Sequence, residues 1–201
     1  MLIDFRTLFP KYGIKPNGIL HVGANVGEEA PVYLELGIKR QIWIEANPEI
    51  YEKLKANISS NPEAVAYNFA AGDEDKMITL HKSNNGSQSS SILELGTHLQ
   101  QHPEVHYIGD IEVPMMRLDN YIFHDCDFLN MDIQGAELLA LKGLGEKIKD
   151  FKWAYLEVNR AEVYKGCPLV EDIDFYLGAY GFNRVETKWV GNWGDAAYVK
   201  N

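Results

Sequence analysis

The sequence has only two cysteines, Cys126 and Cys167, among its 201 residues. Two thiols are too few for a disulfide framework, and without clustered histidines they make no zinc site. This scarcity is typical of a reducing compartment, so we expect a cytoplasmic protein. No stretch reaches the roughly 18 apolar residues that a membrane span requires, and residues 1–6 do not open a signal peptide. We therefore expect no membrane insertion.

Basic residues are also in deficit. The chain has 19 lysines and arginines against 29 aspartates and glutamates, which gives a formal net charge of −10. Such a charge opposes long-range attraction to nucleic acid or to an anionic membrane. We expect no nucleic-acid partner, and the composition leaves the oligomeric state open.

Hydrophobic residues make up 46% of the chain, which is enough for a full core in a domain of this length. The strand-like runs cover residues 19–22, 41–45, 64–70, 127–131 and 153–158. The helical patterns cover residues 28–36, 48–59, 135–144 and 169–179. This alternation predicts an α/β fold with a Rossmann-like, doubly wound, mostly parallel sheet covered by helices on both faces.

The end of the chain breaks the alternation. Residues 182–188 and 194–199 are strand-like runs joined by a turn-rich connection, which predicts a C-terminal antiparallel hairpin. We expect a single domain over residues 1–201, with residues 82–112 as a long irregular insertion. The expected parts are an N-terminal cap (1–17), a ligand-binding core (18–160) and a C-terminal helix with the hairpin (161–201).

The most informative motif is a turn of small and flexible residues, Gly23 to Gly27, directly after the apolar run that ends at Val22. A second apolar run ends on an acid, Glu45, 22 positions after Gly23. Glycines let a backbone approach a ligand closely, and an acid at the second strand's end can accept hydrogen bonds from two ribose hydroxyls. The arrangement predicts a nucleoside pocket; the alternative is a tight turn that holds no ligand.

The turn also favours one nucleoside cofactor. It lacks the G-x-G-x-x-G pattern that seats a pyrophosphate on a helix N-terminus, and Glu28 and Glu29 open the following helix. Carboxylates there would repel a diphosphate but tolerate an ammonium or a sulfonium. S-adenosylmethionine is therefore favoured over NAD. A binding module without turnover and an NAD enzyme remain the alternatives.

Three further acids, Asp73, Asp132 and Glu157, lie at or just after the ends of later predicted strands. Because such strand ends meet at one edge of a doubly wound sheet, we expect all three near the pocket. Asp73 suits the adenine amino group, and an acidic turn is the alternative. Asp132 suits a general base, a group that orients a substrate hydroxyl, or a partner for the cofactor's ammonium. The alternative for Asp132 is a helix cap.

The histidines show no metal-ligand spacing, and two carboxylates alone are a weak metal signal, so we expect no metal. Pro103 separates His102 from His106, which argues against a metal-binding helix face there. The polar segment 85–91 is expected to close over the acceptor together with Trp189 and Trp193. For these tryptophans, packing in the core is the alternative.

Four segments together resemble a known family. They are His21–Gly27, Trp43–Pro48, Val113–Asp119 and Met131–Glu137. In order and spacing, over residues 18–160, they are similar to the FkbM-type methyltransferases, which are class I, S-adenosylmethionine-dependent enzymes. The resemblance implies O-methylation of a hydroxyl on a sugar, a glycan or a related small molecule, with S-adenosylhomocysteine as product.

The resemblance also implies which residues bind the cofactor. The turn from Gly23 to Gly27 would hold the methionine portion, Glu45 the ribose and Asp73 the adenine. The full expected set is His21, Gly23, Ala24, Asn25, Gly27, Glu45, Ala46, Asp73 and Asp132.

One position departs from the family's pattern. Gln134 stands where the family usually has Glu, so position 134 offers no base. A sugar hydroxyl is a poor nucleophile and needs a base as the new bond forms. We expect Asp132 to be that base, with Glu157 or His106 as the second choice.

Overall fold

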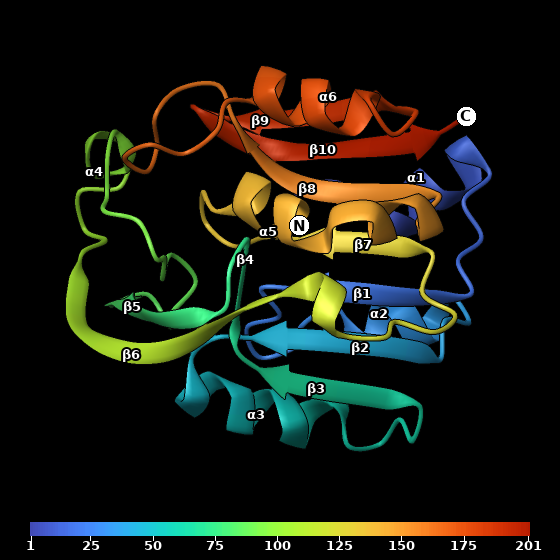
Figure 1. Cartoon of the computed structure of the whole chain (residues 1–201), viewed down its shortest axis with the longest axis horizontal. Helices are drawn as coiled ribbons and strands as arrows, with labels where there is room; N and C mark the ends of the chain where they lie inside the picture. The colour runs from blue at the N-terminus through green and yellow to red at the C-terminus, as the bar shows by residue number, and fades with distance from the viewer.

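The computed structural model describes all 201 residues and centres on a seven-stranded sheet with the order β3-β2-β1-β7-β8-β10-β9 (Figure 1). The strands are β1 (Gly18–Val22), β2 (Arg40–Glu45), β3 (Ala64–Asn68), β7 (Phe128–Met131), β8 (Trp153–Asn159), β9 (Phe182–Val190) and β10 (Trp193–Lys200). The first five strands in this list run parallel, and β10 lies antiparallel between β8 and β9. The strand order reverses between β1 and β7, which is where doubly wound sheets bind their ligands.

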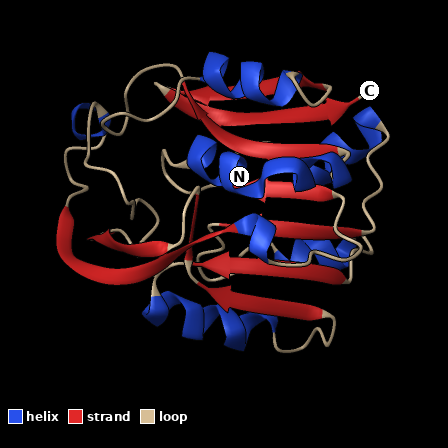
Figure 2. Ribbon diagram, viewed as in Figure 1, coloured by secondary structure: helices blue, strands red, loops and turns tan.

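Helices cover both faces of this sheet (Figure 2). They are α1 (Phe5–Tyr12), α2 (Ala30–Glu35), α3 (Pro48–Ile58), α5 (Glu137–Leu144) and α6 (Val170–Gly178), with the short 3₁₀ helices η1 (Leu118–Asn120) and η2 (Gly145–Asp150). Local sequence explains where α3 begins. The Asn47 side chain accepts a hydrogen bond from the Glu49 backbone N–H at 3.0 Å, and Pro48 occupies the first helical position.

The strands feed two separate cores because successive side chains of a strand point to opposite faces. Leu20 and Val22 of β1 belong to a core of 24 buried residues that also contains side chains of α5 and α6. Ile19 belongs to a second core of 16 buried residues, shared with α1, α2 and α3. Burial on both faces explains why the central strands read as continuous apolar runs.

The structure corrects the expectation for the segment after β3. The single strand predicted over residues 64–70 is divided at Phe69, because β3 pairs with β2 whereas β4 (Ala70–Gly72) pairs with β6. Residues 82–112, expected to be irregular, contain the end of β5 (Lys76–Ser83) and the start of β6 (Tyr107–Arg117). These strands form a second sheet, β4-β6-β5, which projects with α4 (His98–Gln101) beyond the carboxyl ends of the parallel strands (Figure 1). Much of β6 is exposed, so its sequence lacks the apolar signal of a buried strand.

The remaining predicted elements are confirmed to within a few residues, and so is the fold class. The hairpin connection is shorter than expected, because β9 continues through Val190 and β10 begins at Trp193. No helix in the chain combines the length and the apolar character needed to cross a membrane.

Candidate active site

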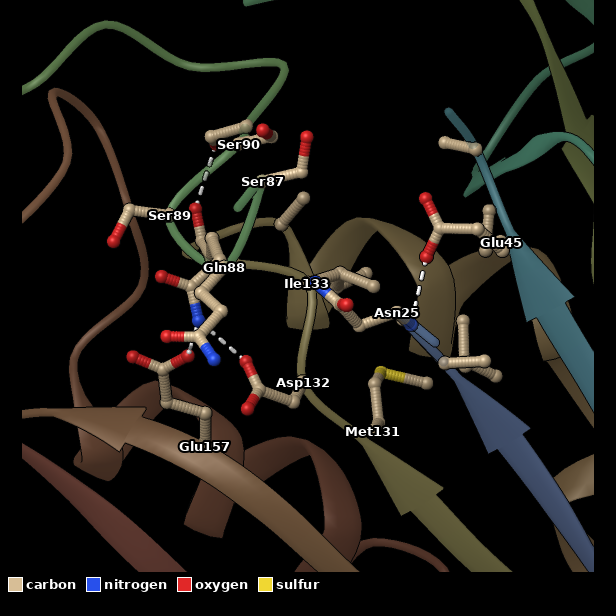
Figure 3. A pocket seen from close by; sticks show the side chains of 18 of the residues that line it. Asn25, Glu45, Ser87, Gln88, Ser89, Ser90, Met131, Asp132, Ile133 and Glu157 are labelled. Carbon is tan, nitrogen blue, oxygen red and sulfur yellow. Dashed lines mark hydrogen bonds between the residues drawn. The ribbon is translucent and has the colours of Figure 1, made fainter. Parts of the chain in front are cut away.

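A cavity of about 550 Å³ lies at the carboxyl ends of the parallel strands (Figure 3). Its wall combines the ends of β1, β2, β7 and β8 with β4, β10 and the insertion that precedes β6. The volume is within the range of small-molecule and cofactor sites.

The first wall is the turn after β1, held against the end of β2. Both oxygens of the Glu45 carboxylate accept a backbone hydrogen bond, Oε2 from Asn25 and Oε1 from Asn47, each at 2.8 Å. Glu45 is 9% exposed, and burial raises its pKa to about 7. The Asn25 backbone is left-handed, with φ +45°. Glu45 thus borders the cavity, and its contact with a cofactor stays a prediction.

Gly23 is required for the close approach of β1 and β7. Its φ is +84°, and a Cβ atom there would lie 1.8 Å from the Asp132 carbonyl oxygen. The Asp132 N–H in turn donates to the Val22 carbonyl at 2.9 Å. Any side chain at position 23 would separate the turn that borders Glu45 from the loop that carries Asp132.

His21 lies at the bottom of this wall, inside a buried network. The Tyr33 hydroxyl is 3.1 Å from Nδ1 of His21 and accepts a hydrogen bond from the Asn130 amide at 2.7 Å. The His21 ring stacks on Trp43 with centroids 4.8 Å apart. Burial lowers the pKa of His21 to about 3, so the imidazole is neutral and packs the floor of the cavity.

The second wall carries a pair of carboxylates that share one donor. Asp132 follows β7 and Glu157 lies near the end of β8. Nε2 of Gln134 donates to Oδ1 of Asp132 at 2.5 Å and also to Oε2 of Glu157. The Tyr164 hydroxyl donates to Oε1 of Gln134 at 2.5 Å, which fixes the orientation of the amide. The sequence had marked Gln134 as a departure from the family's pattern, but only the structure gives it this role.

The two carboxylates differ in their surroundings. Glu157 is 4% exposed, and burial together with the nearby Asp132 charge raises its pKa well above the usual range. Asp132 is exposed to the cavity. Burial thus favours the protonated form of Glu157, while Asp132 faces the space where a ligand would lie.

Glu137 shapes the loop that carries Asp132. Its Oε1 accepts backbone hydrogen bonds from Ile133 at 3.0 Å and Gly135 at 3.2 Å. Glu137 is buried, with its pKa raised to about 7 by burial, and Gln134 between its two partners has a left-handed φ of +56°. The glutamate thus stabilises a turn that otherwise favours glycine or asparagine.

The serine-rich segment lies over both walls (Figure 3). The Asn47 amide donates to the Ser87 hydroxyl at 3.0 Å, on the side of Glu45. The Ser91 hydroxyl donates to the Gln134 carbonyl at 2.7 Å, on the side of the carboxylate pair. The segment therefore bridges the two halves of the cavity, in the position expected of a lid.

Three expected site residues lie away from the cavity. Asp73 follows β4 as the chain turns toward β5, and its carbonyl accepts a hydrogen bond from the Arg117 guanidinium at 2.8 Å. A Cβ at Gly27 would meet the Leu54 side chain, so Gly27 serves the packing of α3. His106 is exposed, and its Nδ1 lies 3.2 Å from the Asn84 amide. All other expected catalytic and cofactor-binding residues border the cavity.

The two tryptophans, expected either at the acceptor or in the core, lie in different places. Trp193 borders the cavity. Trp189 packs on the larger core, where the Arg160 guanidinium lies 5.2 Å from its ring centroid.

Several lining residues had no signal in the sequence. Asp195 of β10 pairs in register with Glu157, and its Oδ2 accepts hydrogen bonds from the Tyr155 hydroxyl and the Leu2 N–H, both at 2.5 Å. His98, His102 and Glu104 reach the cavity from the insertion. The position of Asp195 at the cavity follows from the register between β10 and β8, which the sequence does not show. The structure contains no group of three or more His, Cys, Asp or Glu side chains arranged to hold a metal ion.

Comparisons with known proteins agree with this architecture. The chain is similar to a "SAM dependent methyltransferase" from Aquifex aeolicus, with 15% identity, a TM-score of 0.52, and coverage of 98% of this chain and 89% of the other. A solved methyltransferase FkbM from Methylobacillus flagellatus KT has 16% identity and a TM-score of 0.61, covering 98% of this chain and 48% of the other. At these identities the likeness shows the fold, which is that of the class I methyltransferases.

The family follows from the sequence comparison. The model of the methyltransferase FkbM domain matches residues 21–184, so the chain belongs to that family. A curated relative, the 2-O-methyltransferase NoeI of Sinorhizobium fredii, is 28% identical over 159 residues, which are 74% of this chain and 65% of the relative. The chain thus spans about two thirds of the curated relative and about half of the solved FkbM protein.

Proposed function

We propose that this protein transfers a methyl group from S-adenosylmethionine to a hydroxyl oxygen of a sugar, a glycan or a related small molecule. The observation that carries the proposal is the placement of Glu45 and the Asp132–Glu157 pair on opposite walls of one cavity. The name of the relative NoeI, a 2-O-methyltransferase, supports the same reaction class.

The wall around Glu45 has the chemistry needed for the nucleoside part of the cofactor. Each Glu45 oxygen accepts one backbone hydrogen bond and keeps a second lone pair, so two ribose hydroxyls could still donate to it. Apolar side chains border the same cavity and offer surfaces for an adenine ring; they include Ile44, Phe69, Ala70, Leu80 and Met131. When bound, S-adenosylmethionine supplies a methyl carbon activated by a sulfonium leaving group.

Asp132 is the proposed base. Its carboxylate faces the cavity, and the hydrogen bond from Gln134 Nε2 holds it in one orientation while leaving Oδ2 free to accept a proton. The acceptor oxygen would bond to the methyl carbon as the carbon–sulfur bond breaks to release S-adenosylhomocysteine, and the hydroxyl proton would pass to Asp132. Glu157 is the weaker candidate because burial and the neighbouring charge raise its pKa and so favour its protonated form.

The serine-rich segment is proposed to exclude water and to align the acceptor. It contacts the wall around Glu45 through Ser87 and the wall that carries Asp132 through Ser91. Closing the segment would therefore bring both reactants into one enclosed space. Trp193, at the rim of β10, offers an aromatic face to a sugar ring.

Labelled S-adenosylmethionine tests the proposal. Incubation of the protein with the labelled donor and a panel of glycans should give label in a product whose formation S-adenosylhomocysteine inhibits. S-adenosylhomocysteine should also raise the melting temperature, whereas NAD should not. A melting temperature raised by NAD alone would indicate the dinucleotide enzyme instead. Cofactor binding without transfer to any acceptor would indicate a binding module.

A further inference from the structure

The ionisable side chains on the cavity wall are mainly acidic. Seven carboxyl groups border the cavity, and no lysine or arginine side chain does. The seven are Glu28, Glu29, Glu45, Glu104, Asp132, Glu157 and Asp195. Met1 also borders the cavity, and the positive charge of its α-amino group opposes the rise in pKa that burial causes at Glu29 and Asp195.

This wall is compatible with the donor. S-adenosylmethionine carries a sulfonium, an ammonium and one carboxylate, and therefore a net positive charge. An anionic acceptor would be different, because it would lose water next to Asp132 with no lysine or arginine side chain to pair with it. Burying an unpaired charge among like charges is strongly unfavourable.

The insertion contributes several uncharged polar side chains to the cavity. Ser87, Ser89, Ser90 and Ser91 provide hydroxyls that both donate and accept hydrogen bonds. His98 of α4 also borders the cavity, is 5% exposed, and its Nδ1 has no hydrogen-bond partner. Burial lowers the pKa of His98, which favours the neutral ring.

From these observations we infer that the acceptor is a hydroxylated ring that carries no phosphate, sulfate or carboxylate group. This inference deepens the proposed function and rests on it. It separates neutral glycosides from sugar phosphates, nucleotide sugars and uronic acids, all of which offer hydroxyl groups as well. The serine hydroxyls would form hydrogen bonds with the hydroxyl groups of the acceptor, and the carboxylates would repel anions.

The test compares matched ligands on the protein saturated with S-adenosylhomocysteine. The probes are a methyl hexoside, its 6-phosphate and the corresponding methyl hexuronide, followed by saturation-transfer NMR, which detects weak binding. The neutral glycoside should bind, and each anion should bind at least about tenfold more weakly at low salt. The difference should shrink at 1 M salt, where exposed charges are screened over about 3 Å.

A charge reversal gives the second arm. Glu104→Lys places a cation on the cavity wall, whereas Glu94→Lys makes the same change on the insertion outside the cavity. Only Glu104→Lys should raise the ratio of anion binding to neutral binding. Equal or tighter binding of the anions by the unaltered protein would overturn the inference, and so would the absence of binding by the neutral glycoside. Loss of S-adenosylhomocysteine binding would instead contradict the proposed function, and the same samples report it.

Discussion

Asp132 and Glu157 accept hydrogen bonds from the same nitrogen, Nε2 of Gln134. The two carboxylates come from neighbouring parallel strands and would repel each other if both were ionised without a donor. Tyr164 holds the amide in the orientation that turns its nitrogen toward them. Gln134 can therefore donate to both carboxylates, whereas a glutamate at this position could donate only if it carried a proton.

Gln134→Leu should destabilise the fold by about 1–3 kcal/mol, because the buried Glu157 loses its donor. Urea unfolding of the variant and the unaltered protein measures this loss. Gln88→Leu, which alters an exposed glutamine of the same cavity, is the control. Equal losses of unfolding free energy in the two variants would show that the hydrogen bond from Gln134 to Glu157 does not stabilise the fold.

Glu45→Ala should weaken the binding of S-adenosylhomocysteine by about 1.5–3 kcal/mol, the usual loss for hydrogen bonds to a charged group. Isothermal titration calorimetry gives this difference directly. Glu49→Ala removes an exposed carboxylate close by in the chain and should bind normally. An unchanged affinity of Glu45→Ala would mean that this carboxylate only holds the turn at Asn25.

Cofactor affinity should also depend on pH through Glu45. Burial raises the pKa of this carboxyl to about 7, so it is largely protonated at pH 6 and largely ionised at pH 8. The ionised form accepts more hydrogen bonds from ribose, so the affinity for S-adenosylhomocysteine should rise across this interval. Titrations of the unaltered protein and Glu45→Gln at pH 6, 7 and 8 test the sign. The variant should show a flatter profile, and an affinity that falls with pH would contradict the assignment.

Asp132→Asn keeps the shape of the side chain but removes its ability to accept a proton. If Asp132 is the base, the rate of methyl transfer should fall by about 10²–10⁴, with a much smaller change in cofactor affinity. Single-turnover rates at saturating cofactor, together with calorimetry, separate the two effects. Joint loss of binding and rate would indicate that Asp132 pairs with the cofactor's ammonium. Asp125→Asn, at the other end of β7, controls for the charge change.

Deletion of Asn85–Ser90 should impair acceptor turnover more than cofactor affinity. The segment contacts Asn47 and neighbours the loop of Gln134, but Glu45 keeps its two backbone hydrogen bonds without it. The measurement is kcat and KM for the acceptor beside the calorimetric affinity for S-adenosylhomocysteine. A matched variant replaces the six residues by a glycine–serine segment of equal length. Equal kinetics in the deletion variant and the unaltered protein would make the segment a passive linker.

The sequence by itself determined the parallel sheet, the first turn and the acids at three strand ends. These features are local: an apolar run, a glycine at a left-handed position, and a carboxylate where the strand stops. Glu45, Asp132 and Glu157 could therefore be placed at one sheet edge before the structure was known. The family pattern added that position 134 is unusual.

Only the tertiary structure decided which of these groups meet. Asp73 follows a strand as Glu45 does, yet β4 pairs with β6 in the second sheet, and this pairing carries Asp73 away from the cavity. Asp195 reaches the cavity because β10 inserts antiparallel beside β8, in a register set by contacts along the whole hairpin. Gln134 became the link between two carboxylates because neighbouring parallel strands end side by side. Pairing between distant segments depends on the packing of the complete chain, and no local pattern records it.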